Sequence, residues 1–407
     1  MNLLREEIQK IVKLYGPSFY YLDVVQFSQN YDELTSAFKK YYQNFMISYS
    51  YKTNYIPYLC KMVDEKGGYA EIVSDMEYDI AIKCGVSFDK IIFNGPVKNL
   101  SVVEKILDNN GIVNVDNIFE YTAIKDIAVK KNKQFKLGLR INFDINDGCI
   151  SRFGFDIKSD DFKYVIKDLS KADGLLKLKG MHLHFASRNI NNWPNRATEL
   201  VKLLKEIKLP IEYFSLGGGI YGKMKESLKA QFNSEIPCYD DYAKSVGPVL
   251  SKYFNENYEK QPVMFVEPGT ALVGDCMKFV CPVVSIKNIR GKNIATVLGS
   301  VYNINPTLNG KNPPISIEHF SDKNQKEYVD LDFGGFTCIE SDYLYKHYNG
   351  KLAVGDLVVF DNVGSYSIVL KPPFILPNFP VIIIKNGDVL CIKQKETFED
   401  LFKTYKF

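Results

Sequence analysis

Apolar and polar positions alternate along the first two thirds of the chain in a regular way. Short runs rich in β-branched and aromatic residues end in polar residues, and stretches with apolar residues three or four positions apart separate many of them. This repeat of strand and helix predicts a (β/α)₈ barrel of the TIM type, an α/β fold. Its expected strands are 45–52, 69–74, 91–96, 112–117, 136–142, 180–187, 211–219 and 263–269.

The rhythm changes after Gly269. Apolar runs then follow one another across short turns of Gly, Pro and Asn, with little helix between them. This spacing is typical of an antiparallel β-sandwich or barrel. The strand-like run 17–23 is expected to join it. We therefore predict a barrel domain over residues 24–268 and a β domain made of residues 1–23 and 269–407.

Length, charge and cysteine content narrow the class of protein. The 407 residues exceed the size at which a single core stops growing, about 250–300 residues. The net charge of +3 is spread without basic blocks, so neither nucleic acid nor a membrane is an expected partner. The eight cysteines form no C-x-x-C pair, which predicts reduced thiols, no metal site and a cytoplasmic location. No apolar run reaches the ~18 residues of a membrane span.

Polar residues at the ends of the predicted strands form the candidate site, because barrel enzymes gather their functional groups at the C-terminal ends of the strands. A lysine there can bond covalently to a carbonyl cofactor when a carboxylate and an anion-binding glycine run lie nearby. The strand-end residues include Lys52, Glu71, Asn94, Asp116, Arg140, His182, His184, the run Gly217–Gly219 and Glu267.

Six segments, in their order and spacing, resemble the fold-type III pyridoxal-phosphate decarboxylases, the group of ornithine, arginine and diaminopimelate decarboxylases. The segments are YSYKTN, HLHFAS, SLGGG, EPGT, CIESD and GSYS. The resemblance covers nearly the whole chain. It implies a pyridoxal 5'-phosphate (PLP) cofactor and an enzyme, a carboxy-lyase, that removes the α-carboxylate of an amino acid to give an amine.

The resemblance also assigns cofactor contacts. Lys52 matches the lysine that bonds the cofactor, Glu267 the carboxylate paired with the pyridine nitrogen, and His184 the imidazole stacked on the ring. His182 shares the predicted strand face with His184 and is interpreted as a structural histidine. The phosphate contacts match Gly217, Gly218, Gly219, Ser187 and Tyr366. The three glycines have no Cβ, so their backbone N–H groups are accessible to an anion.

Two further positions match a loop of the family that enters the active site of the partner subunit in a head-to-tail homodimer. Cys338 matches the group that returns a proton to Cα, and Asp342 the carboxylate that contacts the distal amine of the substrate. The resemblance therefore implies active sites shared between two subunits. It favours a basic or diamino acid, or a precursor of a siderophore, polyamine or other secondary metabolite, as the substrate.

Two positions depart from the family pattern. Thr270 stands where the family has arginine, so a guanidinium able to bind phosphate or carboxylate through two hydrogen bonds is missing. Ala186 stands where the family has glycine. Thr270 is still expected to contact the cofactor, through one neutral hydrogen bond. The missing arginine therefore implies that another residue anchors the phosphate or carboxylate group, or that the substrate differs.

Three alternatives stay open at this point. An amino-acid racemase uses a similar barrel with lysine and tyrosine as its two bases, and release of CO₂ would distinguish a decarboxylase from it. A PLP-binding homologue without turnover is the second alternative. The third is an amino-acid substrate attached to a carrier protein, which a screen of free amino acids would miss.

Overall fold

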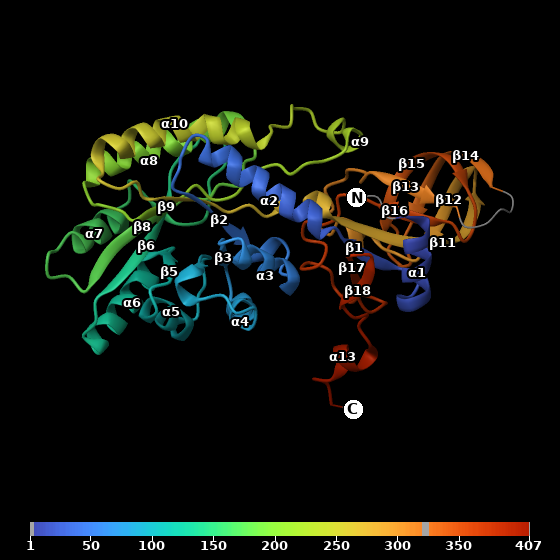
Figure 1. Ribbon diagram of the computed structural model, residues 1–407, viewed down its shortest axis with the longest axis horizontal. Helices are drawn as coiled ribbons and strands as arrows, with labels where there is room; N and C mark the ends of the chain where they lie inside the picture. The colour runs from blue at the N-terminus through green and yellow to red at the C-terminus, as the bar shows by residue number, and fades with distance from the viewer. Residues whose placement is uncertain (1–3, 320–324, 407) are drawn as a thin grey trace. The chain divides into compact units, whose positions relative to one another are not determined.

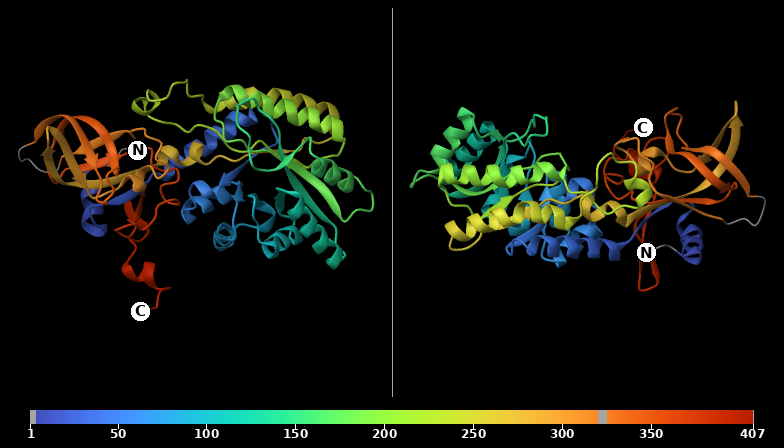
Figure 2. Two further views of the ribbon diagram at one scale, coloured as in Figure 1. Left: turned by 180° about the vertical axis from the view of Figure 1, so that it is seen from behind. Right: turned by 90° about the horizontal axis from the view of Figure 1, so that it is seen from above.

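The computed structural model describes residues 4–319 and 325–406, which form two compact units (Figures 1 and 2). The barrel unit comprises Asn30–Tyr221 and Pro237–Ala271. The β unit comprises Met1–Gln29, Gly222–Ile236 and Leu272–Phe407. The domain limits expected from the sequence, 24–268 for the barrel and 1–23 with 269–407 for the β domain, stay a prediction.

Eight parallel strands close on themselves in the barrel unit, as predicted. Each strand pairs with its neighbours in the order β2-β3-β4-β5-β6-β8-β9-β10, and β10 pairs back with β2. Apolar side chains such as Ile92, Tyr213 and Phe265 form part of the core. The barrel strands are β2 (Phe45–Ser50), β3 (Tyr69–Ile72), β4 (Ile91–Phe93), β5 (Ile112–Val115), β6 (Phe135–Asn142), β8 (Leu176–His182), β9 (Tyr213–Ser215) and β10 (Val263–Val266), and the short β7 (Phe155–Asp156) pairs with β6.

Strand β8 is the one barrel strand whose predicted position was clearly wrong, because it lies at Leu176–His182 and not at 180–187. Lys177 and Lys179 interrupt the apolar pattern in the first half of this strand. The Lys179 amine donates hydrogen bonds to the carbonyls of Asn110 (2.8 Å) and Gly111 (3.2 Å), which lets a charged residue occupy the start of the strand. His184 and Ser187 consequently lie in the loop that follows β8.

Helices cover the outside of the barrel, and α8 and α10 lie side by side along it (Figures 1 and 2). The predicted helices 97–111 and 197–208 are confirmed as α5 and α8. Among the described residues, no helix is long and apolar enough to cross a bilayer. The helices that follow barrel strands are α3 (Pro57–Glu65), α4 (Asp75–Lys83), α5 (Leu100–Asp108), α6 (Ile118–Lys131), α7 (Asp160–Leu169), α8 (Trp193–Ile207), α10 (Tyr239–Asn257) and α11 (Thr270–Val273), while α2 (Val24–Lys39) precedes β2.

The β unit is built on a mixed sheet, not the purely antiparallel one that was predicted. Strand β1, from the N-terminal region, pairs with β11 antiparallel and with β17 parallel, and β12 pairs with β14 parallel. The strands are β1 (Phe19–Leu22), β11 (Met277–Ile289), β12 (Lys292–Val297), β13 (Ile315–Glu318), β14 (Lys326–Gly334), β15 (Tyr343–Leu352), β16 (Leu357–Phe360), β17 (Val381–Lys385) and β18 (Asp388–Lys393).

Short helices complete the β unit. Ile8 and Ile11 of α1 pack on Phe19 and Tyr21 of β1 in a buried apolar cluster, which fixes the N-terminal helix on the sheet. Burial of such side chains contributes roughly 1.5–3 kcal/mol each. These helices are α1 (Arg5–Tyr15), α9 (Glu226–Lys229), α12 (Val301–Ile304) and α13 (Phe398–Phe402).

Candidate active site

Lys52 lies in a single helical turn, Tyr51–Thr53, immediately after β2. Its Nζ donates to Glu71 Oε2 at 2.5 Å, and the Ser50 hydroxyl donates to the same oxygen at 2.7 Å. Burial lowers the pKa of Lys52, but the charges of Glu71 and Glu267 outweigh burial and leave the pKa above its ordinary value. Lys52 is therefore held as an ammonium, paired with a fully buried carboxylate.

Glu267 follows β10 and is buried at the same end of the barrel. Its Oε1 accepts hydrogen bonds from Ser215 Oγ (2.7 Å) and Asn94 Nδ2 (3.2 Å), and His182 Nε2 lies 2.9 Å away. Burial opposes ionisation, but His182, His184 and Lys52 outweigh it and hold the pKa of Glu267 well below its usual value. Glu267 is a buried anion.

The second oxygen of Glu267 tests whether the site fits PLP. Among the described residues, Oε2 has no hydrogen-bond donor although it is buried. A buried carboxylate oxygen without a donor carries a desolvation cost that a bound N–H group would relieve. A protonated pyridine nitrogen is such a donor, so the oxygen fits the ring of the cofactor.

His184 is a neutral imidazole beside this carboxylate. The Gly218 N–H donates to Nδ1 at 2.9 Å, so Nδ1 is an acceptor and does not donate to Glu267 Oε2, 3.5 Å away. Burial, helped by the charge of Lys52, lowers the pKa of His184 to about 4, although the neighbouring Glu267 raises it. The ring therefore presents an uncharged face to the site at neutral pH.

The low pKa of His184 makes stability depend on pH in the cofactor-free protein. Between the folded value of about 4 and the unfolded value of about 6.5, the unfolded chain binds more protons, so stability falls as pH falls. From pH 7 to pH 5 this group is expected to cost about 1–2 kcal/mol. Urea unfolding of wild type and His184→Gln at both pH values measures it. Equal losses of stability in the two proteins would contradict this pKa.

The glycine run after β9 lies close to the neighbouring loops. Gly217 and Gly219 have φ values of 69° and 85°, which favour glycine. A Cβ at Gly217 would lie 2.5 Å from the Leu183 carbonyl oxygen. The Gly217 N–H already donates to Ser215 Oγ (3.1 Å) and the Gly218 N–H to His184. Of the three glycines, only Gly219 has an N–H without an acceptor among the described residues.

Arg196, which sequence reasoning missed, holds these loops together. It is fully buried on α8 and donates to the carbonyls of Leu216 (2.8 Å), Gly218 (2.7 Å), Phe185 (3.2 Å) and Ser187 (2.9 Å). Burial lowers its pKa to about 9. The signal was present in the sequence, because Arg196 lies at helical spacing from the apolar Leu200 and Leu203.

Two of the predicted cofactor contacts, the hydroxyl groups of Ser187 and Thr270, belong to the barrel unit. The Ser187 hydroxyl donates to Asn192 Oδ1 at 2.9 Å. The Thr270 hydroxyl, at the start of α11, accepts a hydrogen bond from Arg188 Nη2 at 3.2 Å. The structure therefore groups Lys52, His184, Gly217–Gly219 and Glu267 in one connected network, with Ser187 and Thr270 on adjacent loops.

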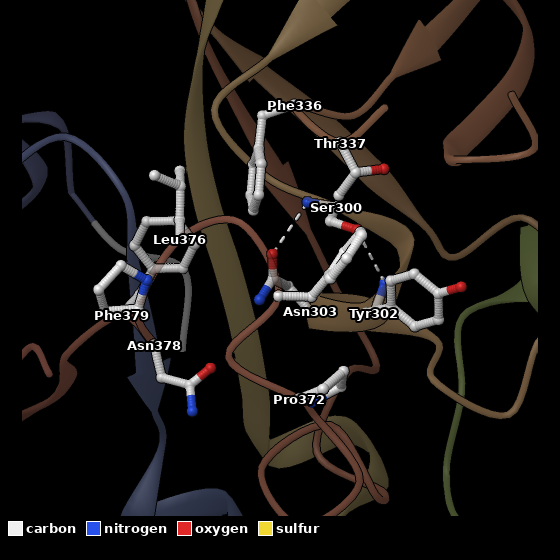
Figure 3. Close-up of a pocket in the computed structure, with 11 residues that line it drawn as sticks. Ser300, Tyr302, Asn303, Phe336, Thr337, Pro372, Leu376, Asn378 and Phe379 are labelled. Carbon is white, nitrogen blue, oxygen red and sulfur yellow. Dashed lines mark hydrogen bonds between the residues drawn. The ribbon is translucent and has the colours of Figure 1, made fainter. Parts of the chain in front are cut away.

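Cys338, Asp342 and Tyr366 belong to the β unit. Asp342 is buried, and its carboxylate accepts hydrogen bonds from Ser300 Oγ (3.0 Å), Val301 N (2.7 Å), Thr337 Oγ1 (2.6 Å) and Thr337 N (3.2 Å). Ser300 and Thr337 also line a small cavity together with Phe336 (Figure 3). Asp342 thus fixes the loop that carries the exposed Cys338.

The contacts of Asp342 account for its burial without any ligand, and its role in substrate binding stays a prediction. Tyr366, with a φ of 65°, is half-buried in the segment after β16. Its contact with the phosphate and the proton transfer by Cys338 also stay predictions.

A closed parallel barrel with a lysine, a buried anionic carboxylate and a glycine loop at the ends of its strands defines a barrel enzyme for a carbonyl cofactor. Residues 29–274 match the family model described as pyridoxal-dependent decarboxylase, pyridoxal binding domain. The match covers more than half of the chain, so the chain belongs to the pyridoxal-dependent decarboxylase family and its cofactor is PLP.

Similar proteins are decarboxylases. The chain is 25% identical to diaminopimelate decarboxylase of Methanocaldococcus jannaschii, over 96% of this chain and 92% of that protein. It is 26% identical to the L-glutamyl-[BtrI acyl-carrier protein] decarboxylase of Niallia circulans, over 99% and 97%. The crystal structure of the M. jannaschii enzyme in complex with L-lysine superposes with a TM-score of 0.85 at 23% identity, covering 98% of this chain and 94% of the other.

Proposed function

We propose that this PLP-dependent decarboxylase acts on a basic or diamino amino acid, in a cytoplasmic homodimer with active sites shared between the subunits. The observation that carries the proposed chemistry is the pairing of Lys52 with Glu71 beside the ionised Glu267, whose second oxygen has no donor among the described residues. The substrate class is supported by relatives named diaminopimelate decarboxylase.

The residues of the barrel unit would perform separate tasks. When bound, PLP supplies an electron-accepting ring for the electron pair left on Cα as CO₂ departs. Lys52 would bond the cofactor through its Nζ, which the ion pair with Glu71 positions at the end of β2. Glu267 would hold its charge at the pyridine nitrogen, and neutral His184 would cover one face of the ring without competing for the proton.

The loop of the β unit would complete the site of the partner subunit. Cys338 is exposed there and would return a proton to Cα. The hydrogen bonds of Asp342 to Ser300, Val301 and Thr337 would hold the backbone around Cys338 in place. This arrangement implies that an isolated subunit is inactive.

A second candidate is an aminoacyl group attached to a carrier protein. It is supported by the N. circulans relative, which is named for a glutamyl group on an acyl-carrier protein and aligns over almost the full length of both chains. Such a substrate would use the same Lys52 and Glu267 chemistry but a different entrance to the site.

A decarboxylation screen tests both candidates. L- and D-amino acids, and aminoacyl carrier proteins, would be incubated with the enzyme, and amine products and CO₂ would be measured by mass spectrometry with Lys52→Ala as the control. We expect CO₂ release from a basic or diamino acid. Release only from a carrier-bound acyl group would favour the second candidate. PLP binding with no CO₂ release from any substrate would contradict both.

A further inference from the structure

We propose that Arg188 supplies the guanidinium that binds the cofactor phosphate, so that a residue of the loop after β8 performs this task while Thr270 only positions it. The inference rests on PLP binding, which family membership establishes, and on no assumption about the substrate. It names a residue that the sequence motifs did not single out.

The side chain of Arg188 lies between two loops of the predicted phosphate site. Its Nη2 donates to Thr270 Oγ1 at 3.2 Å, which ties it to the loop after β10. Its Cζ lies 5.4 Å from the ring centroid of Tyr221, two residues beyond Gly219. The guanidinium is thus held between the Thr270 hydroxyl and the ring of Tyr221, the residue two positions after the glycine run.

The backbone of this segment is fixed against the glycine run. The Tyr242 hydroxyl donates to the carbonyl of Arg188 at 2.7 Å, and Arg196 donates to the carbonyl of Ser187 at 2.9 Å. A Cβ at Gly219 would approach the Ser187 carbonyl oxygen to 2.6 Å. Segment 187–188 and the glycine run therefore form one packed surface, and Arg188 projects from a rigid base.

The charge of Arg188 is not compensated within the described residues, because no carboxylate lies within ion-pair distance of its guanidinium. The other arginines of the barrel core are engaged differently: Arg140 lies 3.6 Å from Asp116, and Arg196 binds four carbonyls. Arg188 is half-buried, and among the described groups its guanidinium donates only to the neutral hydroxyl of Thr270. A guanidinium with unused donors in such a place suits a phosphate dianion.

The phosphate also needs donors beyond the glycine run. The N–H groups of Gly217 and Gly218 donate to Ser215 and His184, so the glycine run offers fewer free donors than the sequence suggested. The fork of Arg188 restores two or more charge-assisted hydrogen bonds. The short Thr270 leaves room for this guanidinium and orients it through one hydrogen bond.

Equilibrium binding of PLP and of pyridoxal, which lacks the phosphate, tests the proposal without any turnover. Cofactor-free wild type, Arg188→Gln and the control Arg290→Gln, an exposed arginine between β11 and β12, would be titrated with each ligand while the cofactor absorbance is followed. For Arg188→Gln we expect the Kd of PLP to rise about 10- to 100-fold and the Kd of pyridoxal to stay within about twofold. Arg290→Gln should change neither value.

Equal weakening of PLP and pyridoxal binding, or no change in either, would overturn the proposal. Arg188→Lys provides a second test should the glutamine variant fail to fold, because it keeps the charge and loses the fork. For Arg188→Lys, the Kd of PLP should rise about 3- to 10-fold and the Kd of pyridoxal should not change. An unchanged Kd of PLP would contradict phosphate binding by the forked guanidinium. A substrate screen without CO₂ release would not affect the conclusion drawn from these titrations. Titrations that contradict the role of Arg188 would not affect the proposed substrate.

Discussion

Replacing Lys52 with alanine is expected to lower kcat by roughly a thousandfold or more, because it removes the group that would bond covalently to the cofactor. Lys52 is the amine that would bond the cofactor, and it sits against the buried Glu71 in a single turn after β2. No other lysine side chain of the described barrel unit is paired with Glu71.

The measurement is steady-state decarboxylation with the substrate that the screen identifies. Lys61→Ala is a matched control, because Lys61 is an exposed lysine on α3 a few residues further along the chain. The control should keep wild-type activity. Comparable kcat values for Lys52→Ala and wild type would show that the chemistry does not depend on this amine.

Glu267→Gln is expected to lower kcat by about 100- to 1000-fold, the loss seen when a preorganised electrostatic group is removed. The amide keeps the shape and an acceptor for Ser215 and Asn94 but has no negative charge. Without that charge the pyridine nitrogen is not held protonated, and the ring accepts electrons less readily. KM should change little, because the carboxylate would contact the cofactor and not the substrate.

Steady-state kinetics and the cofactor spectrum measure this effect together. Glu212→Gln is the matched control: Glu212 is exposed at the opposite end of β9 and pairs with Lys136 at 2.6 Å. It should leave kcat and the spectrum unchanged. A Glu267→Gln enzyme with near wild-type kcat would mean that the buried anion has no part in catalysis.

The fold was largely predictable because its strongest signals are local. Eight apolar runs separated by helical stretches defined the barrel, and only β8 was placed in error, because Lys177 and Lys179 interrupt its first half. The β unit was harder. Strands β14 and β15 carry many exposed polar residues, so their apolar pattern is weak, and the parallel pairs β1–β17 and β12–β14 join segments distant in sequence.

The site was predictable where a motif carried it and not where tertiary contacts define it. Lys52, His184 and Glu267 were found through six spaced segments, and the structure brings these three together. The partners of Arg188 and Arg196 are a hydroxyl and backbone carbonyls from other loops. The spacing of Arg196 from Leu200 and Leu203 indicates that it is buried, but a single sequence does not show which groups either arginine binds.

Reduction of the holoenzyme with borohydride, followed by digestion and mass spectrometry, tests the central claim most directly. Borohydride fixes the bond between an amine and the carbonyl carbon of the cofactor, so the modified peptide identifies the attached residue. We expect the pyridoxyl mass on the peptide that contains Lys52. A label on a peptide without Lys52, or no label in a protein shown to bind PLP, would contradict the assignment of Lys52.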